Sequence, residues 1–400
     1  MNFPFYIAKR YLFSKSSNNT INIITFIAAL GVLIGTLALF IVLSGFSGLR
    51  TFSLGFLNTS DPDLKISPAQ GKSFFFNDSI KTNLDHEKDI ISYSKVIEER
   101  AFFEFKEKTH IASIKGVDKN YTQVNSIDST VYSGTWIDKE IANGVVIGNG
   151  ISAILSMGIF DFENSLKIYV PKPGKGYINN PNNAFNKINT QPIGIYALTS
   201  DIDKKYSFVS LELAQELLSY KADQISAIEL RIDELSDREQ ILNSLKFTLG
   251  DAYKIETREQ LNAVFYKMLN TENMASYLIF TLILIIALFN VIGAIIMMIL
   301  DKKDNLKTLY SMGATIKEIK RIFVLQGFLL TVGGLIIGLF IGIILVLLQK
   351  KFELFMITPY LAYPVEFTYL NTFLVALTIL ILGFLSAKIA SSRISKKLVE

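Results

Sequence analysis

Four stretches of the chain are apolar for long enough to cross a lipid bilayer. A transmembrane helix needs about 20 predominantly apolar residues, and four windows reach this length, at residues 21–46, 274–300, 322–348 and 368–390. None contains Lys, Arg, Asp or Glu before its last few residues. With half of all residues hydrophobic, the sequence predicts a membrane protein of four spans. The first apolar core is too long for a signal peptide, so we expect a retained anchor.

Basic residues in the short loops predict the orientation of the spans, because Lys and Arg are retained on the cytoplasmic side. The 301–321 loop, the N-terminal segment and the C-terminal tail are basic, whereas two Glu balance the two Lys of loop 349–367. We therefore expect residues 1–20, 301–321 and 391–400 in the cytoplasm. Residues 47–273 and the 349–367 loop are expected outside it. The first segment, "FPFYIAKRYLF", suits a helix in the membrane interface, although a frayed tail would look similar.

The long insert at 47–273 has the pattern of a folded α+β region of one or two domains, and we expect two subdomains. Segments such as "SLKIYVP" and "QPIGIYAL" are typical strands, and "SLELAQELLSY" and "REQILNSLKFTLG" are typical helices. The intervening stretch "KPGKGYINNPNNAFNKINT" is rich in Gly, Pro and Asn, which predicts an exposed loop. A helical period continues from "REQLNAVFYKML" into the second span, so we expect a stalk.

Several classes of site are absent from the sequence. It has no cysteine, which excludes disulfides, thiolate metal sites and a lipid-modified N-terminal Cys, and its two histidines have no companion ligands. "GKS" at 71–73 lacks the leading Gly of a phosphate loop, because Ile66 stands there. A net charge of +4 gives no nucleic-acid signal. We expect no catalytic residue, cofactor or metal in this chain.

The spans contain packing signals and one strongly polar residue. Gly334, Gly338 and Gly342 recur at every fourth position, as do Gly31 and Gly35, which predicts close contacts between helices. Asn290 lies deep in the second span. Because an unpaired amide is costly in hydrocarbon, we expect it to face protein or a polar cavity, and an interhelical hydrogen bond is as good an explanation as contact with a substrate.

These motifs together resemble the permeases of lipoprotein-releasing ABC transporters, the LolC/LolE family within the MacB/FtsX group. The resemblance covers nearly the whole chain and includes "AKRYL", "GVLIGTLALFIVLSGFSGL", "GVVIGNGISAIL" and "ETREQLNAVFYKMLNTE". Its most specific part is "LFNVIGAIIMMILDKKDNLKTLYSMGATIKEIKRIFVLQGFLLTVGG". The tail "AKIASSRISKKLVE" lacks the family's usual ending. The resemblance implies four transmembrane helices and a periplasmic α+β domain of the MacB-like core type inserted between helices 1 and 2.

The resemblance also implies a function. The chain would be the permease subunit that extracts lipoproteins from the bacterial inner membrane and passes them to a LolA-like periplasmic carrier. LolD-like ATPase subunits would bind ATP and Mg, and a second permease, the same or a sister chain, would complete the transporter in contact with membrane lipid. The alternatives are a MacB-like efflux or mechanotransmission permease and an FtsX-like regulator of cell-wall hydrolases, with a non-transport receptor as a further class.

The resemblance assigns roles to three groups of residues. The 301–321 segment would be a coupling helix in a groove of the ATPase, although a solvated loop is the plainer interpretation. Its residues are Leu306, Lys307, Leu309, Met312, Gly313, Ala314, Lys317 and Lys320. Apolar residues near the external end of the first two spans would line a lipid path, unless they only pack on neighbouring helices. They are Leu39, Phe40, Leu43, Phe46, Met274 and Tyr277.

The third group is the loop from Lys172 to Thr190, which resembles the hook by which one permease type recruits the carrier. A loop longer than about 12 to 15 residues is uncommon unless it is functional or disordered. Its candidate contact residues are Pro173, Tyr177, Ile178, Pro181 and Phe185. The Asn-rich stretch "NNPNN" is equally typical of a disordered tip.

Overall fold

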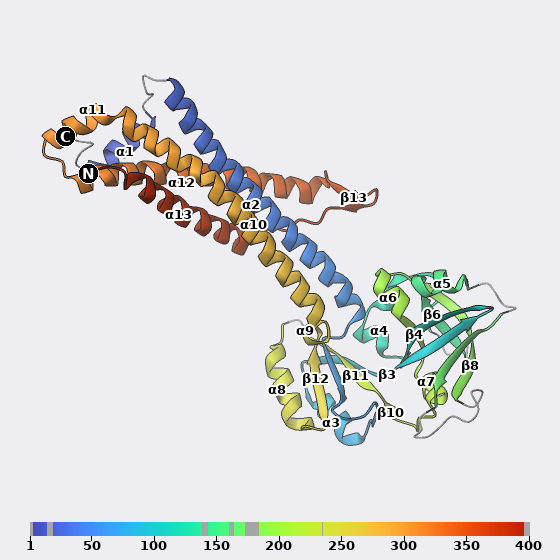
Figure 1. Ribbon diagram of the computed structural model, residues 1–400. Coiled ribbons are helices and arrows are strands. Elements are labelled where there is room, and N and C mark those ends of the chain that lie inside the picture. The colour runs from blue at the N-terminus through green and yellow to red at the C-terminus, as the bar shows by residue number, and fades with distance from the viewer. Residues whose placement is uncertain are drawn as a thin grey trace. The chain divides into compact units, whose positions relative to one another are not determined.

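The computed structural model describes residues 3–13, 19–137, 143–159, 164–172, 184–233 and 235–395. The chain divides into two compact units. The helical unit comprises residues 1–53 and 265–400, and the inserted unit comprises residues 54–264. Figure 1 shows the long helices of the first unit and the sheet of the second.

Four helices are long and apolar enough to cross a membrane: α2 (Asn19–Ser60), α10 (Ala263–Asp301), α12 (Ile316–Phe352) and α13 (Tyr369–Ser391). The predicted fold class is therefore confirmed: four candidate membrane helices with an α+β domain inserted between the first two. The helices are longer than the apolar windows. Helix α2 continues to Ser60, and α10 begins at Ala263, because a helix does not need to end where the hydrocarbon ends.

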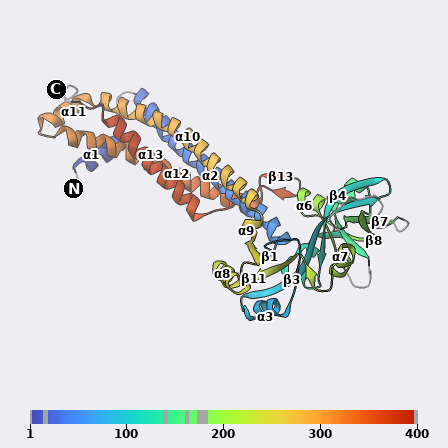
Figure 2. The same ribbon diagram turned by 60° about the horizontal axis from the view of Figure 1, so that its bottom comes forward.

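Glycines bring the four helices together, as the spacing of Gly334, Gly338 and Gly342 predicts. A Cβ at Gly338 would lie 2.7 Å from the carbonyl oxygen of Leu33, and one at Gly342 would lie 2.8 Å from the ring of Phe40. Such distances exclude any larger residue, so the backbones of α2 and α12 are in close contact. Figure 2 shows the long helices side by side in a second view.

Shorter elements lie at the two ends of this bundle. Helix α1 (Phe3–Phe13) packs on α12, where the rings of Tyr11 and Phe323 are 6.4 Å apart, and α11 (Lys303–Ser311) connects α10 to α12. At the other end, a hairpin of β13 (Met356–Thr358) and β14 (Leu361–Ala362) connects α12 to α13. The Gln349 side chain fixes this hairpin, because its Oε1 accepts from the N–H of Phe355 while its Nε2 donates to the carbonyl of Tyr363.

The inserted unit is built on one sheet of ten described strands in the order β12-β1-β11-β3-β4-β9-β6-β8-β5, with β7 pairing β3 and β8. A single sheet thus runs through the region where the sequence predicts two subdomains. The strands are β1 (Leu64–Pro68), β3 (Ile90–Phe105), β4 (Lys108–Val117), β5 (Val131–Gly134), β6 (Gly144–Gly148), β7 (Leu166–Pro171), β8 (Phe185–Tyr196), β9 (Tyr206–Ser210), β11 (Ala227–Ile232) and β12 (Tyr253–Thr257). A separate pair is formed by β2 (Phe74–Phe75) and β10 (Gln224–Ile225).

Helices cover the two ends of this sheet (Figure 1). They are α3 (Asp78–His86), α4 (Tyr121–Val124), α5 (Asn149–Leu155), α6 (Ser200–Lys205), α7 (Leu211–Leu218), α8 (Arg238–Leu249), α9 (Arg258–Leu261) and the 3-10 turn η1 (Ile127–Thr130). Helices α3 and α8 lie near β12, whereas α5, α6 and α7 lie on the β4, β6 and β8 side. The apolar residues of α7 and α8 join the strands in one core that fixes the ends of the sheet, including β1 and β12.

Candidate coupling, lipid-path and stalk-joint residues

The 301–321 segment forms a helix, a turn and the start of the next span. Helix α11 ends at Ser311, and Gly313 follows with a φ of +100°, a conformation that strongly favours glycine. Thr315 then begins α12 with a capping box, in which its Oγ1 accepts from the N–H of Glu318 at 3.3 Å and its own N–H donates to the Glu318 carboxylate at 2.8 Å. In the sequence, residues 304–323 have the pattern of two short helices hinged at Gly313, which predicts a second short helix here. The structure shows instead one helix that runs without a break into the span.

The predicted coupling residues divide between the bundle core and the surface. Leu306 is fully buried, and Leu309 and Ala314 are half-buried and pack against the same core. Met312 is 73 % exposed, Gly313 and Lys317 are also exposed, and Lys307 and Lys320 are half-buried. Leu306 therefore anchors α11 to the bundle, while Met312 presents an apolar group to the outside at the turn.

The predicted lipid-path residues also divide. Leu39, Phe40 and Leu43 are buried in the core of this chain's own bundle, with exposed fractions of 0, 0 and 3 %. Phe46 and Tyr277 are half-buried, and the Tyr277 hydroxyl is 2.7 Å from Oγ1 of Thr378. The remaining residue of the group, Met274, is 60 % exposed. Contact with an acyl chain from outside would be direct for Met274, whereas Leu39, Phe40 and Leu43 would need a rearrangement of the bundle.

The predicted hook connects two strands that pair with each other. Strands β7 and β8 are antiparallel, and Pro171 pairs with Phe185 at the end nearest the loop. Phe185 is 43 % exposed. Pro173, Tyr177, Ile178 and Pro181 lie outside the described residues.

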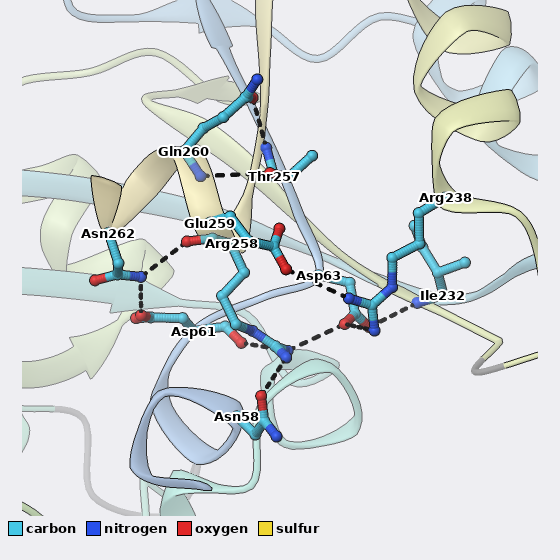
Figure 3. Close-up of polar contacts among 10 residues, drawn as sticks. All are labelled: Asn58, Asp61, Asp63, Ile232, Arg238, Thr257, Arg258, Glu259, Gln260 and Asn262. Atoms are coloured by element: carbon cyan, nitrogen blue, oxygen red, sulfur yellow. Dashed lines mark hydrogen bonds and ion pairs between the residues drawn. The ribbon is translucent and has the colours of Figure 1, made fainter. Parts of the chain in front are cut away.

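An arginine that the sequence analysis did not single out connects several elements of the inserted unit. Figure 3 shows Arg258, a residue that is 8 % exposed. It donates to Oδ1 of Asn58 in the last turn of α2, to the carbonyl of Asp61 at 3.0 Å and to Oδ1 of Asp63 at 3.1 Å. Asn58 belongs to the end of α2, and Asp61 and Asp63 lie in the short segment before β1. Arg258, the first residue of α9, therefore holds the end of α2 and this segment against α9. We call Asn58, Asp61, Asp63, Arg258 and Asn262 the stalk joint.

The other members of the stalk joint complete its polar contacts. Asp63 is 9 % exposed, and its Oδ2 accepts from the N–H of Ile232 at 3.0 Å. Arg238 approaches the same carboxylate at 3.4 Å. Asn262, between α9 and α10, donates to Asp61 at 2.7 Å. Each charge therefore has an opposite charge or a hydrogen bond, as buried ions require.

The sequence signal for this cluster is the segment "ETREQ". Thr257 and Gln260 form a reciprocal capping box that begins α9. That pattern predicts a helix start, and it places Arg258 in the first turn. The partners of Arg258 are about 200 positions away in the chain, so the capping pattern could predict the helix but not the cluster.

A second buried charge network lies in the centre of the sheet. Lys115 on β4 is 2.8 Å from Glu229 on β11, and Glu229 also accepts from Nδ2 of Asn125 at 2.8 Å. Burial alone would lower the pKa of Lys115, but the nearby Glu229 raises it well above the ordinary value. For the Glu98 carboxyl, burial alone would raise the pKa. The neighbouring Lys65 and Lys115 ammonium groups have the larger effect and lower this pKa to about 2.

These networks are structural ties and contain no arrangement suited to catalysis. Among the described residues, no group of three or more His, Asp and Glu side chains is placed to hold a metal ion. In both networks the charged groups are paired with opposite charges or hydrogen-bonded, as structural ion pairs are. What the geometry can do is transmit displacement between helix ends that are fixed to one another.

Comparison with known proteins gives relatives along most of the chain. The family model of the FtsX-like permease C-terminal domain matches residues 277–399. The lipoprotein-releasing system transmembrane protein LolE of Haemophilus influenzae is 25 % identical over 87 % of this chain and 83 % of its own length. LolC of Buchnera aphidicola is 24 % identical over 95 % of this chain and 93 % of its own. A solved structure of the periplasmic region of MacB from Actinobacillus actinomycetemcomitans is 12 % identical, covering 51 % of this chain and 92 % of that one with a TM-score of 0.36.

Proposed function

We propose, from its resemblance to LolE and LolC along most of its length, that this chain is the permease subunit of a lipoprotein-releasing ABC transporter. It would extract lipoproteins from the outer leaflet of the bacterial inner membrane and pass them to a periplasmic carrier. The observation that carries the proposal is the extent of the similarity, which reaches 87 % and 95 % of the chain. It therefore includes the inserted unit as well as the C-terminal permease domain.

The same features separate this proposal from its alternatives. An FtsX-like regulator is expected to have a much smaller inserted domain than residues 54–264. A MacB-like efflux permease is expected to carry its own ATPase, and this sequence contains no G-x-x-x-x-G-K-[ST] motif. The resemblance to LolE and LolC implies instead that ATP and Mg are bound by a separate ATPase subunit.

The orientation follows from the basic loops. With both termini in the cytoplasm, α11 and the Gly313 turn face the ATPase, and the inserted unit lies in the periplasm. Exposed Met312 and Lys317 then offer an apolar group and a charge to a groove of the partner. Closure of the ATPase on nucleotide would push α11, which Leu306 connects to the bundle.

The proposed second partner in the membrane is a permease of the same type, and the exposure of the Asn290 amide supports this pairing. This residue lies inside the apolar second span, in the C-terminal half of α10, and is exposed on the surface of the chain. An amide that faces lipid is costly, so a helix of another chain is the expected cover. The lipid path and the carrier hook remain proposals of the same kind, resting on the resemblance to the family.

The experiment is reconstitution of the chain in vesicles with its ATPase, a lipoprotein and a soluble carrier. ATP-dependent release should occur with the wild type and stop with Gly313→Val, because a β-branched residue at φ +100° costs about 1 to 3 kcal/mol and changes the turn. A steric clash would not explain such an effect, since nothing lies within 4 Å of a Cβ at this position.

Gly71→Val is the matched control. Gly71 has a φ of +85° and equally open surroundings, but it lies in the inserted unit. It should show a similar local strain with release retained. Unchanged release by an inserted, well-expressed Gly313→Val protein would remove the coupling role. If the wild type neither binds an ATPase nor releases lipoprotein, the proposed function itself is wrong.

A further inference from the structure

A groove of about 900 Å³ lies in the helical unit between α1, α2, the end of α10 and α12. Most of its wall is apolar, and it includes Leu30, Leu33, Leu329, Leu330, Ile336 and Ile337. Two of these, Ile336 and Ile337, are 62 and 51 % exposed, so the groove is open on that side, and in a membrane-spanning bundle these apolar groups would face lipid. Its volume is within the range of about 300 to 1,000 Å³ that is typical of small-molecule sites.

One end of the groove is charged. Lys9 of α1, Asp301 at the end of α10 and Lys302 line it there, and Nζ of Lys302 is 2.9 Å from the Asp301 carboxylate. Lys9 is exposed on α1. The two ammonium groups and one carboxylate leave this end with a net positive charge. A ligand with an anionic head group and an apolar tail therefore matches both the positive end and the apolar wall of the groove.

Gln326 provides a buried polar group in the wall. Its side chain is 2 % exposed and lines the groove, and its Nε2 is 3.0 Å from Sδ of Met298. Its Oε1 has no hydrogen-bond partner among the described residues. A buried amide oxygen without a donor is destabilising unless a ligand or water donates to it. This oxygen is one turn inside the apolar part of α12, between the charged end and the apolar wall.

The length of the groove matches one leaflet of a bilayer. Gln326 and Ile337 both line it, and eleven residues of α-helix rise about 16 Å. Half of the hydrocarbon core is about 15 Å. We propose that the groove binds an anionic phospholipid of the leaflet on the α11 side, with its phosphate near Lys9 and Lys302 and one acyl chain along α12.

The site has a direct connection to α11. Tyr11 lines the groove, and its hydroxyl lies near the side chain of Asn305 on α11. Lys302 is the residue immediately before this helix. If α11 is the coupling helix of the proposed function, the bound lipid supports it from the membrane side. Binding itself does not depend on that role, and the experiment below measures binding alone.

The full-length protein is reconstituted in nanodiscs that contain equal amounts of phosphatidylglycerol and phosphatidylcholine with identical acyl chains. It is then extracted into detergent, and the retained phospholipid is counted by native mass spectrometry. We expect one retained phosphatidylglycerol per chain. Lys9→Gln should reduce this retention about fivefold, which corresponds to about 1 kcal/mol for one basic residue near an anionic lipid. Arg10→Gln removes the neighbouring charge, which does not line the groove, and should retain the lipid.

A pair of glycine variants tests the apolar part. Gly333 lines the groove, and a Cβ there meets nothing within 4 Å, so Gly333→Leu adds its side chain at the groove without a clash at the Cβ. Gly293 on α10 has equally open surroundings but does not line the groove. Gly333→Leu should lose the bound lipid, whereas Gly293→Leu should keep it.

Three results would overturn the proposal. The first is equal retention of the two phospholipids by the wild type, and the second is equal retention by the two glycine variants. The third is a wild-type dimer that Gly333→Leu dissociates in the same spectra, which would assign the groove to a second copy of the chain.

Discussion

Replacing Arg258 by Met should destabilise the inserted unit strongly, because it leaves the Asp63 carboxylate buried with fewer partners. Removing one member of a buried ion pair costs about 3 to 5 kcal/mol. Asp63 would keep the N–H of Ile232 at 3.0 Å and the half-exposed Arg238 at 3.4 Å. We therefore expect the lower end of that range, about 3 kcal/mol. Adding Asp63→Asn should recover part of the loss, since no uncompensated buried charge would remain.

The chain contains its own reporter for this measurement. Trp136 is the one tryptophan of the sequence, and its ring is stacked on Tyr121 inside the inserted unit at a centroid distance of 6.3 Å. Its fluorescence in a urea titration of the full-length protein in detergent therefore follows unfolding of that unit. Arg100→Met, which removes an exposed arginine of β3, is the matched control and should change the free energy of unfolding by less than about 0.5 kcal/mol. If Arg258→Met had no larger effect than this control, the stalk joint would not be a stabilising cluster.

Three further outcomes are expected. The pKa of Glu98 is lowered from 4.5 to about 2, so the contribution of this carboxylate to stability should be present above pH 4.5 and lost as the pH falls towards 2. Glu98→Gln should therefore flatten that part of a curve of unfolding free energy against pH, measured by Trp136 fluorescence. An unchanged curve would contradict the assignment. Tyr177→Ala combined with Phe185→Ala should weaken carrier binding about tenfold or more, whereas unchanged affinity would leave the loop a connecting role. Asn290→Leu should weaken pairing of two permeases by about 1 kcal/mol, and equal pairing of this variant and wild type would place the amide outside the interface.

The spans were predictable because a bilayer imposes a length and a polarity that can be read along the chain. The helix ends were not. Helix α2 continues from residue 46 to Ser60 because "SGLRTFSLGFLNTS" contains no proline, and the helix ends just before Pro62. Hydropathy measures the thickness of the hydrocarbon, whereas the end of a helix depends on local backbone chemistry. The sequence also predicts a helical period that continues from "REQLNAVFYKML" into the second span, and the structure confirms it from Ala263 onward but interrupts it at Asn262, where α9 ends.

The stalk joint could not be predicted because its contacts are distant in sequence. Arg258 and Asn58 are 200 positions apart, and Asp63 is 195 positions from Arg258. The strand order of the sheet could not be predicted for the same reason. Strand β1 lies between β11 and β12, which come from the other end of the inserted unit's sequence. The burial of Leu39, Phe40 and Leu43 also depends on which face of α2 meets α12, and a uniformly apolar window contains no such information.

The bundle is packed too closely for its helices to bend independently. A Cβ at Gly334 would be 2.9 Å from Val32 of α2, one at Gly35 would be 2.9 Å from Leu284 of α10, and one at Gly383 of α13 would be 2.6 Å from Thr331 of α12. At the hairpin end, Nδ2 of Asn371 donates to the carbonyl of Leu43 at 3.1 Å and thus ties α13 to α2. Closely packed interfaces of this kind move between discrete arrangements rather than deform continuously. If α11 is the coupling helix of the proposed transporter, a push on it is therefore expected to displace the closely packed parts of the four helices together.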